Sequence, residues 1–204
     1  MKNKIIIGIT GKSGAGKTTV SNIFKSYGFA HINTDKTLTE LYKKNTLCFN
    51  EITDAFSDYD ILDEAGEISR IKLADVVFND EERLELLNEI SHKHIIEKIR
   101  SITNSGGGRY KGFAVDGAAL IESGFDNECD YIITVTASEN ELKRRIIKRD
   151  MISEDKAVQR LKAQKDDDFY TKEADFVINN NGDMRSLYKI VENVIFQLEG
   201  AILG

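Results

Sequence analysis

The residues best suited to chemistry form a glycine-rich segment near the N-terminus. It reads Gly11-Lys12-Ser13-Gly14-Ala15-Gly16-Lys17-Thr18 and matches the pattern G-x-x-x-x-G-K-[ST]. The three glycines allow the backbone to adopt positive φ, so that successive N–H groups can turn inward around an anion. The segment therefore predicts a cradle for nucleotide phosphates. The residues predicted to bind phosphate are Gly11, Ser13, Gly14, Ala15, Gly16, Lys17 and Thr18.

Two side chains at the end of this segment have distinct predicted roles. Lys17 supplies a positive charge for the β- and γ-phosphates, which makes it a catalytic candidate, and the Thr18 hydroxyl is a ligand for Mg²⁺. The alternative is a glycine turn in which the lysine and threonine are incidental. The strand predicted before the segment and the helix predicted after it favour the cradle. A dinucleotide-binding fingerprint is excluded because no third glycine follows Gly16.

Two aspartates follow predicted strands, and both are candidates for binding an acceptor substrate. Asp35 comes just after the strand predicted at 29–33, and Asp116 ends the strand predicted at 112–116. The carboxyl edge of a doubly wound sheet is where such folds bind ligands. Asp35 serves equally well as the N-cap of a helix that starts at Lys36. Asp116 has the alternative of initiating a turn, or could contact metal through water.

A basic helix completes the candidate set. Five of the seven residues from Lys143 to Arg149 are cationic, and Arg145 and Arg149 lie four apart on one face. A mobile lid over a triphosphate would use such a face and would exclude water on closing. The alternative is a solvated basic surface, and helical spacing does not decide between the two.

These candidates require a fold that brings strand ends together. Short apolar runs predict strands at 4–10, 29–33, 112–116, 131–135 and 176–178, separated by segments with helical spacing. Alternation of strands and helices predicts an α/β fold, a doubly wound parallel sheet of about five strands. A mainly helical insert at about 36–104 predicts a substrate lobe within one domain spanning 1–204. Ser138 and Glu141 predict a capping box, and 105–108 predicts a glycine turn.

Composition narrows the class of protein. The 204 residues carry a formal net charge of −6, which is atypical of a nucleic-acid binder. The apolar run at the N-terminus is too short for a signal peptide or a membrane span. The two cysteines are far apart in sequence and have no metal-ligand spacing, as in a cytoplasmic protein with reduced thiols. We therefore expect a cytoplasmic protein without nucleic-acid or membrane partners, and we predict no oligomeric state.

The cradle is shared by several classes of protein, and the remaining residues favour one. A GTPase would contain a guanine-reading Asn-Lys-x-Asp segment, which does not occur in this sequence. Motor and transporter ATPases are normally larger. The length of the chain instead favours a kinase that uses ATP and Mg²⁺ and phosphorylates a small molecule.

At this point the chain resembles the dephospho-CoA kinase family almost from end to end. The resemblance rests on the cradle, on the aspartate after the second strand, on an Arg-x-x-x-Arg-Asp helix and on an Asn-Asn-Gly loop. The matching segments are Ile9–Thr18, Ile32–Asp35, Glu40–Tyr42, Arg70–Ala74, Val77–Phe78, Leu87–His92, Val115–Asp116, Leu120–Glu122, Arg145 with Arg149–Asp150, Arg160–Leu161 with Gln164, and Asp175–Gly182.

The resemblance implies a function and a set of roles. The implied reaction is ATP-dependent phosphorylation of the ribose 3′-hydroxyl of dephospho-CoA, the last step of coenzyme A synthesis. Asp35 would be the general base, and Arg145 would contact phosphates from a lid at about 143–172. Asn180 and Gly182 would lie near the adenine, and the insert would receive dephospho-CoA. The alternatives are a kinase of another small nucleotide or metabolite, and a nucleotide-binding module without catalysis.

Among the departures from the family pattern, two involve charged residues. Lys12 stands within the cradle where the family usually has glycine, so we expect an additional charge beside the phosphates. The run Lys165-Asp166-Asp167-Asp168 is acidic where a phosphate lid would favour cations, and we expect it to face solvent.

Overall fold

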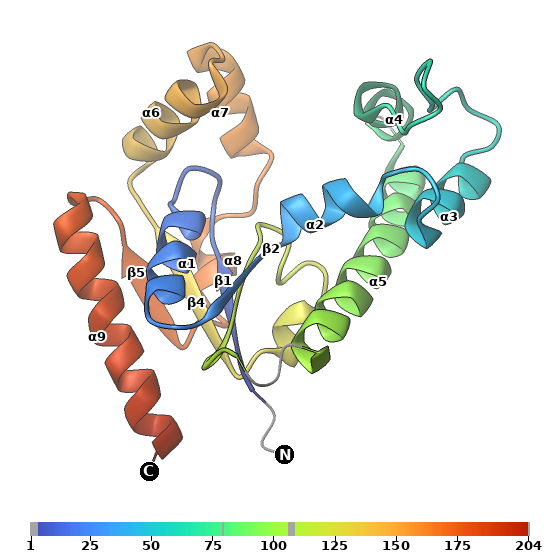
Figure 1. Cartoon of the computed structure of the whole chain (residues 1–204). Helices are drawn as coiled ribbons and strands as arrows, with labels where there is room; N and C mark the ends of the chain where they lie inside the picture. The colour runs from blue at the N-terminus through green and yellow to red at the C-terminus, as the bar shows by residue number, and fades with distance from the viewer. Residues whose placement is uncertain (1–3, 79, 106–108, 204) are drawn as a thin grey trace. The chain divides into compact units, whose positions relative to one another are not determined.

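The computed structural model describes residues 4–78, 80–105 and 109–203 (Figure 1). Contacts between residues divide the chain into two compact units, 34–106 and the remainder. The helical insert predicted at about 36–104 lies inside the first of these. The last three glycines of the turn predicted at 105–108 lie outside the described residues. Among the described residues, no helix combines the length and the apolar character needed to cross a bilayer.

The larger unit contains a parallel sheet and the helices around it. Its elements are β1 (Ile5–Thr10), α1 (Lys17–Ser26), β2 (Ala30–Asn33), β3 (Gly112–Asp116), the short 3₁₀ helix η1 (Phe125–Glu128), β4 (Tyr131–Thr136), α6 (Glu139–Asp150), α7 (Glu154–Lys162), α8 (Asp167–Thr171), β5 (Phe176–Asn179) and α9 (Met184–Leu203). The strand order is β2-β3-β1-β4-β5, and the four pairings are all parallel. The predicted five-stranded parallel sheet is therefore confirmed, with each strand within about two residues of its predicted range.

The two faces of the sheet are covered by different helices. Because side chains alternate along a strand, Ile133 and Val135 of β4 face one way and Ile132 and Thr134 the other. Ile133 and Val135 belong to the main apolar core, to which α1 and α9 contribute Phe24, Val191, Ile195 and other buried side chains. The Thr134 hydroxyl donates to the Tyr170 carbonyl of α8, 2.5 Å away. Helices α1 and α9 thus lie on one face of the sheet and α8 lies on the other.

The smaller unit is helical. It contains α2 (Thr34–Leu41), α3 (Leu47–Ala55), α4 (Arg70–Val77) and the 25-residue α5 (Glu81–Ser105). Helix α5 contacts each of the other three and contributes Ile90 to an apolar core of its own. This core also contains Cys48, Phe49, Ile52, Phe56, Ile61, Ile68, Leu73 and Val77. The buried side chains of α5 recur at the three- and four-residue spacing of one helix face, at Ile90, His94 and Ile95 among others.

One local prediction is wrong. Ser138 is the N-cap of α6, but its side chain makes no capping hydrogen bond. Glu141, the expected partner in the capping box, instead binds Arg144 at 2.8 and 3.1 Å. The Ser138 backbone N–H donates to Oδ1 of Asn181 at 2.8 Å, which links the start of α6 to the loop after β5. A guanidinium three residues away therefore holds the carboxylate more strongly than a backbone amide would.

Candidate active site

The segment between β1 and α1 has the backbone of an anion cradle. Gly11, Gly14 and Gly16 have φ of 129°, 84° and 107°, as predicted from their positions in the motif. At Gly11, a side chain would also meet the Val135 carbonyl oxygen of β4 at 2.2 Å. Gly16 is the N-cap of α1 and provides no side-chain cap. Helix α1 therefore begins without a side-chain cap, as at helix N-termini that bind a phosphate.

Lys17 and Thr18 begin helix α1 beside this loop. The Lys17 ammonium donates to the carbonyl oxygens of Gly11 at 2.7 Å and Lys12 at 3.1 Å. The lysine thus folds back across the loop, so that its charge is held at the cradle. Thr18 is exposed at the start of the helix. The two side chains lie at the positions that the motif requires for phosphate and magnesium chemistry.

Asn180 supports the cradle from the end of β5. Its side-chain amide donates to the Ala15 carbonyl at 2.7 Å, and its own side chain is buried. A β-carbon on Gly16 would lie 2.3 Å from the Asn180 amide nitrogen, so this contact requires glycine at 16. Gly182 is exposed two residues later, just before α9. Asn180 therefore meets the phosphate loop itself, which the expectation of a position near the adenine did not include.

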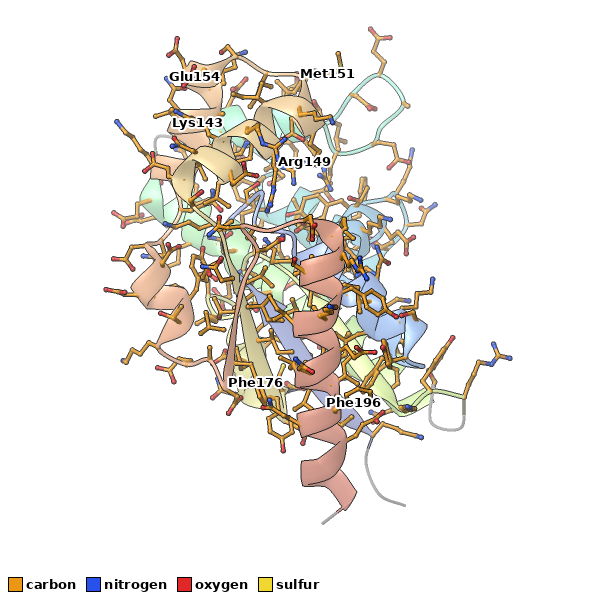
Figure 2. The ribbon with its side chains drawn as sticks, turned by 90° about the vertical axis from the view of Figure 1, so that its left-hand side faces the viewer. Lys143, Arg149, Met151, Glu154, Phe176 and Phe196 are labelled. Atoms are coloured by element: carbon orange, nitrogen blue, oxygen red, sulfur yellow. The ribbon has the colours of Figure 1, made fainter. Side chains whose placement is uncertain are left out.

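The predicted basic helix contacts the cradle instead of forming a wholly solvated face. Arg145 donates to the carbonyls of Gly14 and Ala15, both at 3.3 Å, and to that of Asn180 at 2.7 Å. Arg149, one turn later, donates to the Ser13 hydroxyl at 3.1 Å. Figure 2 shows Lys143 and Arg149 on α6, with Met151 at the turn into α7. The shared face of Arg145 and Arg149 therefore points at the loop.

The α6–α7 hairpin is fastened by two groups of charges. Asp150 binds Arg149 at 2.7 and 2.9 Å and also binds Arg160 of α7. Lys143 and Glu154, both labelled in Figure 2, pair at 2.8 Å. Arg149 first, and then Arg160, hold the pKa of the Asp150 carboxyl below its usual range. The hairpin that carries the two cradle-binding arginines is thereby cross-linked through one carboxylate.

Replacing Asp150 with asparagine should lower the free energy of unfolding by about 0.5–1 kcal/mol, because the ion pairs are partly exposed. A lowered pKa means that the carboxylate stabilises the fold above its unfolded value near 3.8, and that this contribution is lost as pH falls through the folded value. The difference between wild type and variant should stay constant from pH 7 to about 4.5 and shrink in more acid solution. Urea unfolding at several pH values measures it.

An exposed carboxylate outside this network is the control. Asp58→Asn should leave the wild-type stability unchanged across the same pH range. A wild-type minus Asp150→Asn difference that grew as pH fell would contradict the assignment, because it would mean that the charged form is disfavoured in the folded protein.

Asp116 is engaged by two residues of the neighbouring strand. It is 2% exposed, and its Oδ2 lies 3.0 Å from His31 Nε2 while its Oδ1 accepts from the Asn33 amide at 2.5 Å. His31 and Asn33 alternate along β2 and so face the same side, and β2 pairs with β3 in register Asn33↔Asp116. The Asp116 carboxylate thus joins the carboxyl ends of β2 and β3. Asp116 is therefore buried and bonded to two side chains, which a turn-initiating role alone would not require.

Asp35 lies in the first turn of α2, two residues after the end of β2. Helix α2 begins at Thr34, so Asp35 is inside the helix and the interpretation of Asp35 as its N-cap is wrong. Its side chain is exposed. The Thr39 hydroxyl donates to the Asp35 carbonyl at 2.8 Å and accepts from Arg70 at 2.7 Å. Asp35 therefore presents an exposed carboxylate in the first turn of α2.

The two charged departures from the family pattern, Lys12 and the acidic run at 165–168, are in contact with each other. The Lys12 ammonium lies 3.1 Å from the Asp167 carboxylate. Asp166 caps α8 by accepting the Phe169 N–H at 2.9 Å. The acidic run is exposed, as expected, and two of its aspartates also make specific contacts. One of them starts a helix, and the other neutralises the additional lysine of the cradle.

Several of these contacts were missed from the sequence. His31 and Asn33 have a readable signal, since alternate residues of one strand share a face with whatever the next strand presents. Gln164 accepts the Ser13 backbone N–H at 2.7 Å. Its place in the Arg-Leu-x-x-Gln match marked it, but nothing in the local spacing indicates a partner 151 residues away.

Comparisons with known proteins agree with this geometry. The family model for dephospho-CoA kinase matches residues 5–186. The chain is 38% identical to a dephospho-CoA kinase of Aquifex aeolicus over 192 residues, covering 94% of this chain and 96% of the relative. For the dephospho-CoA kinase of Fusobacterium nucleatum the identity is 36% over 188 residues, with 92% and 95% covered.

Solved structures extend the similarity to the fold. A dephospho-CoA kinase from Campylobacter jejuni superposes with a TM-score of 0.69 at 28% identity, covering 96% of this chain and 98% of the other. A shikimate kinase from Acinetobacter baumannii, at 15% identity and a TM-score of 0.58, shares the fold and covers 100% and 97%. The extent of the family match and the complete cradle lead to one conclusion: this chain belongs to the dephospho-CoA kinase family.

Proposed function

We propose that this protein transfers the γ-phosphoryl group of ATP to the ribose 3′-hydroxyl of dephospho-CoA, which gives coenzyme A and ADP. The observation that carries the proposal is a complete phosphate cradle, with Lys17 held at the loop, inside a chain that matches the family from residue 5 to residue 186. In the reaction the 3′-oxygen forms a bond to the γ-phosphorus, and the bond from that phosphorus to the β–γ bridging oxygen breaks.

The cradle residues would hold the triphosphate. Backbone N–H groups of the loop and the start of α1 would surround the β- and γ-phosphates, apart from those of Ser13 and Ala15, which donate to Gln164 and to the Lys12 carbonyl. Lys17 would balance the charge that builds on the phosphates. The exposed Thr18 hydroxyl suits Mg²⁺, which binds few protein ligands and keeps phosphate oxygens and waters around it. When bound, the ion would neutralise phosphate charge. Within the described residues, no group of three or more acidic, histidine or cysteine side chains could hold a metal.

Arg145 would act on the cradle and on the phosphates together. Its guanidinium already joins the loop to the end of β5 through three carbonyl oxygens. Asn180 would position the nucleotide through the Ala15 carbonyl that it binds, and Gly182 would leave room beside the base. These contacts support a cationic α6–α7 lid whose face is turned to the loop.

Asp35 would accept the proton of the acceptor hydroxyl. Its carboxylate is exposed, and its helix begins where β2 delivers the chain to the carboxyl edge of the sheet. Asp116 would contribute by holding that edge through His31 and Asn33, and a substrate hydroxyl would be its third partner. The helical unit would receive the remainder of dephospho-CoA. We further infer a cytoplasmic location, which the two free thiols at Cys48 and Cys129 support.

The test is a turnover assay with a panel of acceptors. The protein is incubated with ATP and Mg²⁺ in the presence of dephospho-CoA, adenosine, shikimate or no acceptor, and ADP and the phosphorylated product are quantified. We expect stoichiometric coenzyme A and ADP with dephospho-CoA alone. Turnover only with another acceptor would replace the substrate assignment, and ATP binding without turnover on any acceptor would indicate a binding module.

Replacing Arg145 with alanine is expected to lower kcat/KM for ATP by about 10²-fold, the usual cost of one donor at a site of developing charge. The variant removes the three bonds that tie the loop to β5 as well as the charge itself. Arg145→Lys restores the charge but not the three-way contact, and should recover only part of the loss. Steady-state kinetics with varied ATP measure both.

Arg144→Ala is the matched control, because its side chain is the neighbouring arginine on the same helix and is 62% exposed. It should leave kcat/KM within about 2-fold of wild type. If Arg145→Ala had the same kcat/KM for ATP as Arg144→Ala, the contacts of Arg145 with the loop would not contribute to catalysis. The basic helix would then be a solvated surface.

A further inference from the structure

The outer limb of the cradle, Lys12 and Ser13, is bonded to the segment that joins α7 to α8. The Ser13 backbone N–H donates to Oε1 of Gln164 at 2.7 Å. The Lys12 ammonium lies 3.1 Å from Asp167. Two successive cradle residues are thus fastened to residues that lie more than 150 positions later in the chain. Neither contact follows from the phosphate-binding motif itself.

Gln164 is itself held in place. Its backbone N–H donates to the Leu161 carbonyl at 3.2 Å, and its side-chain amide donates to the Arg160 carbonyl at 2.9 Å. Oε1 is thereby left pointing at Ser13, because the orientation of the carboxamide is fixed by the donor side. Arg160 binds Asp150, which binds Arg149, and Arg149 returns to the Ser13 hydroxyl. One hydrogen-bond network, which includes Gln164 and Arg149, therefore binds both the backbone N–H and the side-chain hydroxyl of Ser13.

The backbone of Asp167 is also held in place, by the helix to which it belongs. It lies in the first turn of α8, whose N-cap is Asp166. Helix α8 is attached to β4 by the hydrogen bond from the Thr134 hydroxyl to the Tyr170 carbonyl, and Tyr170 is 2% exposed. Lys12 is 21% exposed and Asp167 is 52% exposed. A pair this open contributes little to stability, but it directs the lysine toward a fixed carboxylate.

We propose that Gln164 is a positioning residue for phosphoryl transfer and that the Lys12–Asp167 pair is its second tie. Together they fix the outer limb of the cradle, so that the N–H groups that receive the triphosphate are already in place. The additional lysine then acts on the shape of the loop rather than as a ligand of the nucleotide. This inference rests on the proposed ATP site, but it concerns residues outside the phosphate-binding motif and the lid arginines.

Binding of ATP to the full-length protein tests the role of Gln164, by fluorescence titration with a labelled ATP analogue and by steady-state kinetics. Gln164→Ala should raise the Kd and KM for ATP about 10-fold while kcat changes by less than about 3-fold. In this variant part of the free energy of ATP binding must be used to order the loop, which lowers the affinity. Gln164→Glu keeps an acceptor for the Ser13 N–H but adds a negative charge. It should keep the wild-type Tm and still weaken ATP binding.

Gln159→Ala is the matched control, since Gln159 is an exposed glutamine on α7, the helix that precedes Gln164. It should match wild type in all three measurements. The inference is overturned if Gln164→Ala binds ATP within 2-fold of wild type. It is overturned equally if the variant loses affinity only in proportion to a fall in Tm. Wild-type turnover on dephospho-CoA is measured in the same series, so a failure of the proposed function is seen separately from a failure of this inference.

The role of the Lys12–Asp167 pair is tested by removing each charge in turn and comparing the direction in which the Kd for ATP changes. If the pair holds the loop, Lys12→Met and Asp167→Asn should each raise the Kd for ATP about 3-fold, and the double variant should be no weaker than either single one. If Lys12 were instead a ligand of the nucleotide, removing Asp167 would release it and tighten binding while Lys12→Met weakened it. Effects of opposite sign would therefore overturn the assignment.

Discussion

Asp35→Asn is expected to lower kcat on dephospho-CoA about 10³-fold, with little change in the KM for ATP. A positioned general base typically contributes 10²–10⁴-fold, and asparagine keeps the shape of the side chain without its basicity. Asp35 lies in the first turn of α2 with an exposed side chain, so the substitution disturbs no packing. Steady-state kinetics with saturating ATP and varied dephospho-CoA measure the loss.

Stability must be followed in the same experiment, because an acidic residue in the first turn of a helix also favours the helix dipole. That contribution is about 0.3–1 kcal/mol, which is too small to unfold the protein. Asp54→Asn, an exposed aspartate on α3 of the same helical unit, is the control and should retain wild-type kcat. A kcat for Asp35→Asn within 5-fold of wild type would refute the general-base assignment and leave Asp35 with a local helical role.

The sheet and the cradle could be predicted because their signals are local. Each strand is a short apolar run with a turn or helix signal on either side, and a parallel sheet buries such runs on both faces. The cradle needs glycine at 11, 14 and 16, where the backbone has positive φ and other residues of the same protein approach closely. The positive φ at these positions can be predicted from the motif itself, whereas the close approaches of Val135 and Asn180 depend on the rest of the fold. The fold class therefore followed from pattern and chirality alone.

Contacts made by side chains across the fold could not be predicted in the same way. Asp116 was identified as a strand-end carboxylate, yet its two partners on β2 depend on the register between β2 and β3. Register between distant strands is set by packing and connections, which a single sequence does not report. The same holds for Lys12 and Asp167. Each looked anomalous alone, and each explains the other once α8 is placed against β4.

The capping error shows how a local rule loses to a stronger neighbour. Ser138 and Glu141 have the spacing of a capping box, but Glu141 also lies three residues before Arg144 and four before Arg145. A charged hydrogen bond to a guanidinium is worth more than a bond to one backbone amide. Arg144 accordingly lowers the pKa of the Glu141 carboxyl. In a helix with five cations in seven residues, the ion pair was the better prediction.

Lys17→Ala should have the largest effect of all, a loss of about 10⁴-fold in kcat/KM, within the range of 10³–10⁵ for a cation that stabilises the transferring phosphoryl group. The ammonium lies against the carbonyls of Gly11 and Lys12, so the charge is held at the loop before any nucleotide arrives. A charge already in place costs no reorganisation when the phosphoryl group moves, which is why its removal should affect kcat as well as KM.

Two further variants test whether the Lys17 ammonium is required. Lys17→Met keeps the aliphatic stem and should be nearly as inactive as Lys17→Ala, because the stem supplies no charge. Lys25→Ala lies in the last turn of the same helix, is exposed, and should retain full activity. If Lys17→Met kept more than a tenth of the wild-type kcat/KM, neither the charge of Lys17 nor its hydrogen bonds to the Gly11 and Lys12 carbonyls would be required for transfer. The charge on the transferring group would then have to be balanced by other cations, of which Arg145 and Arg149 are the two that reach the loop from α6.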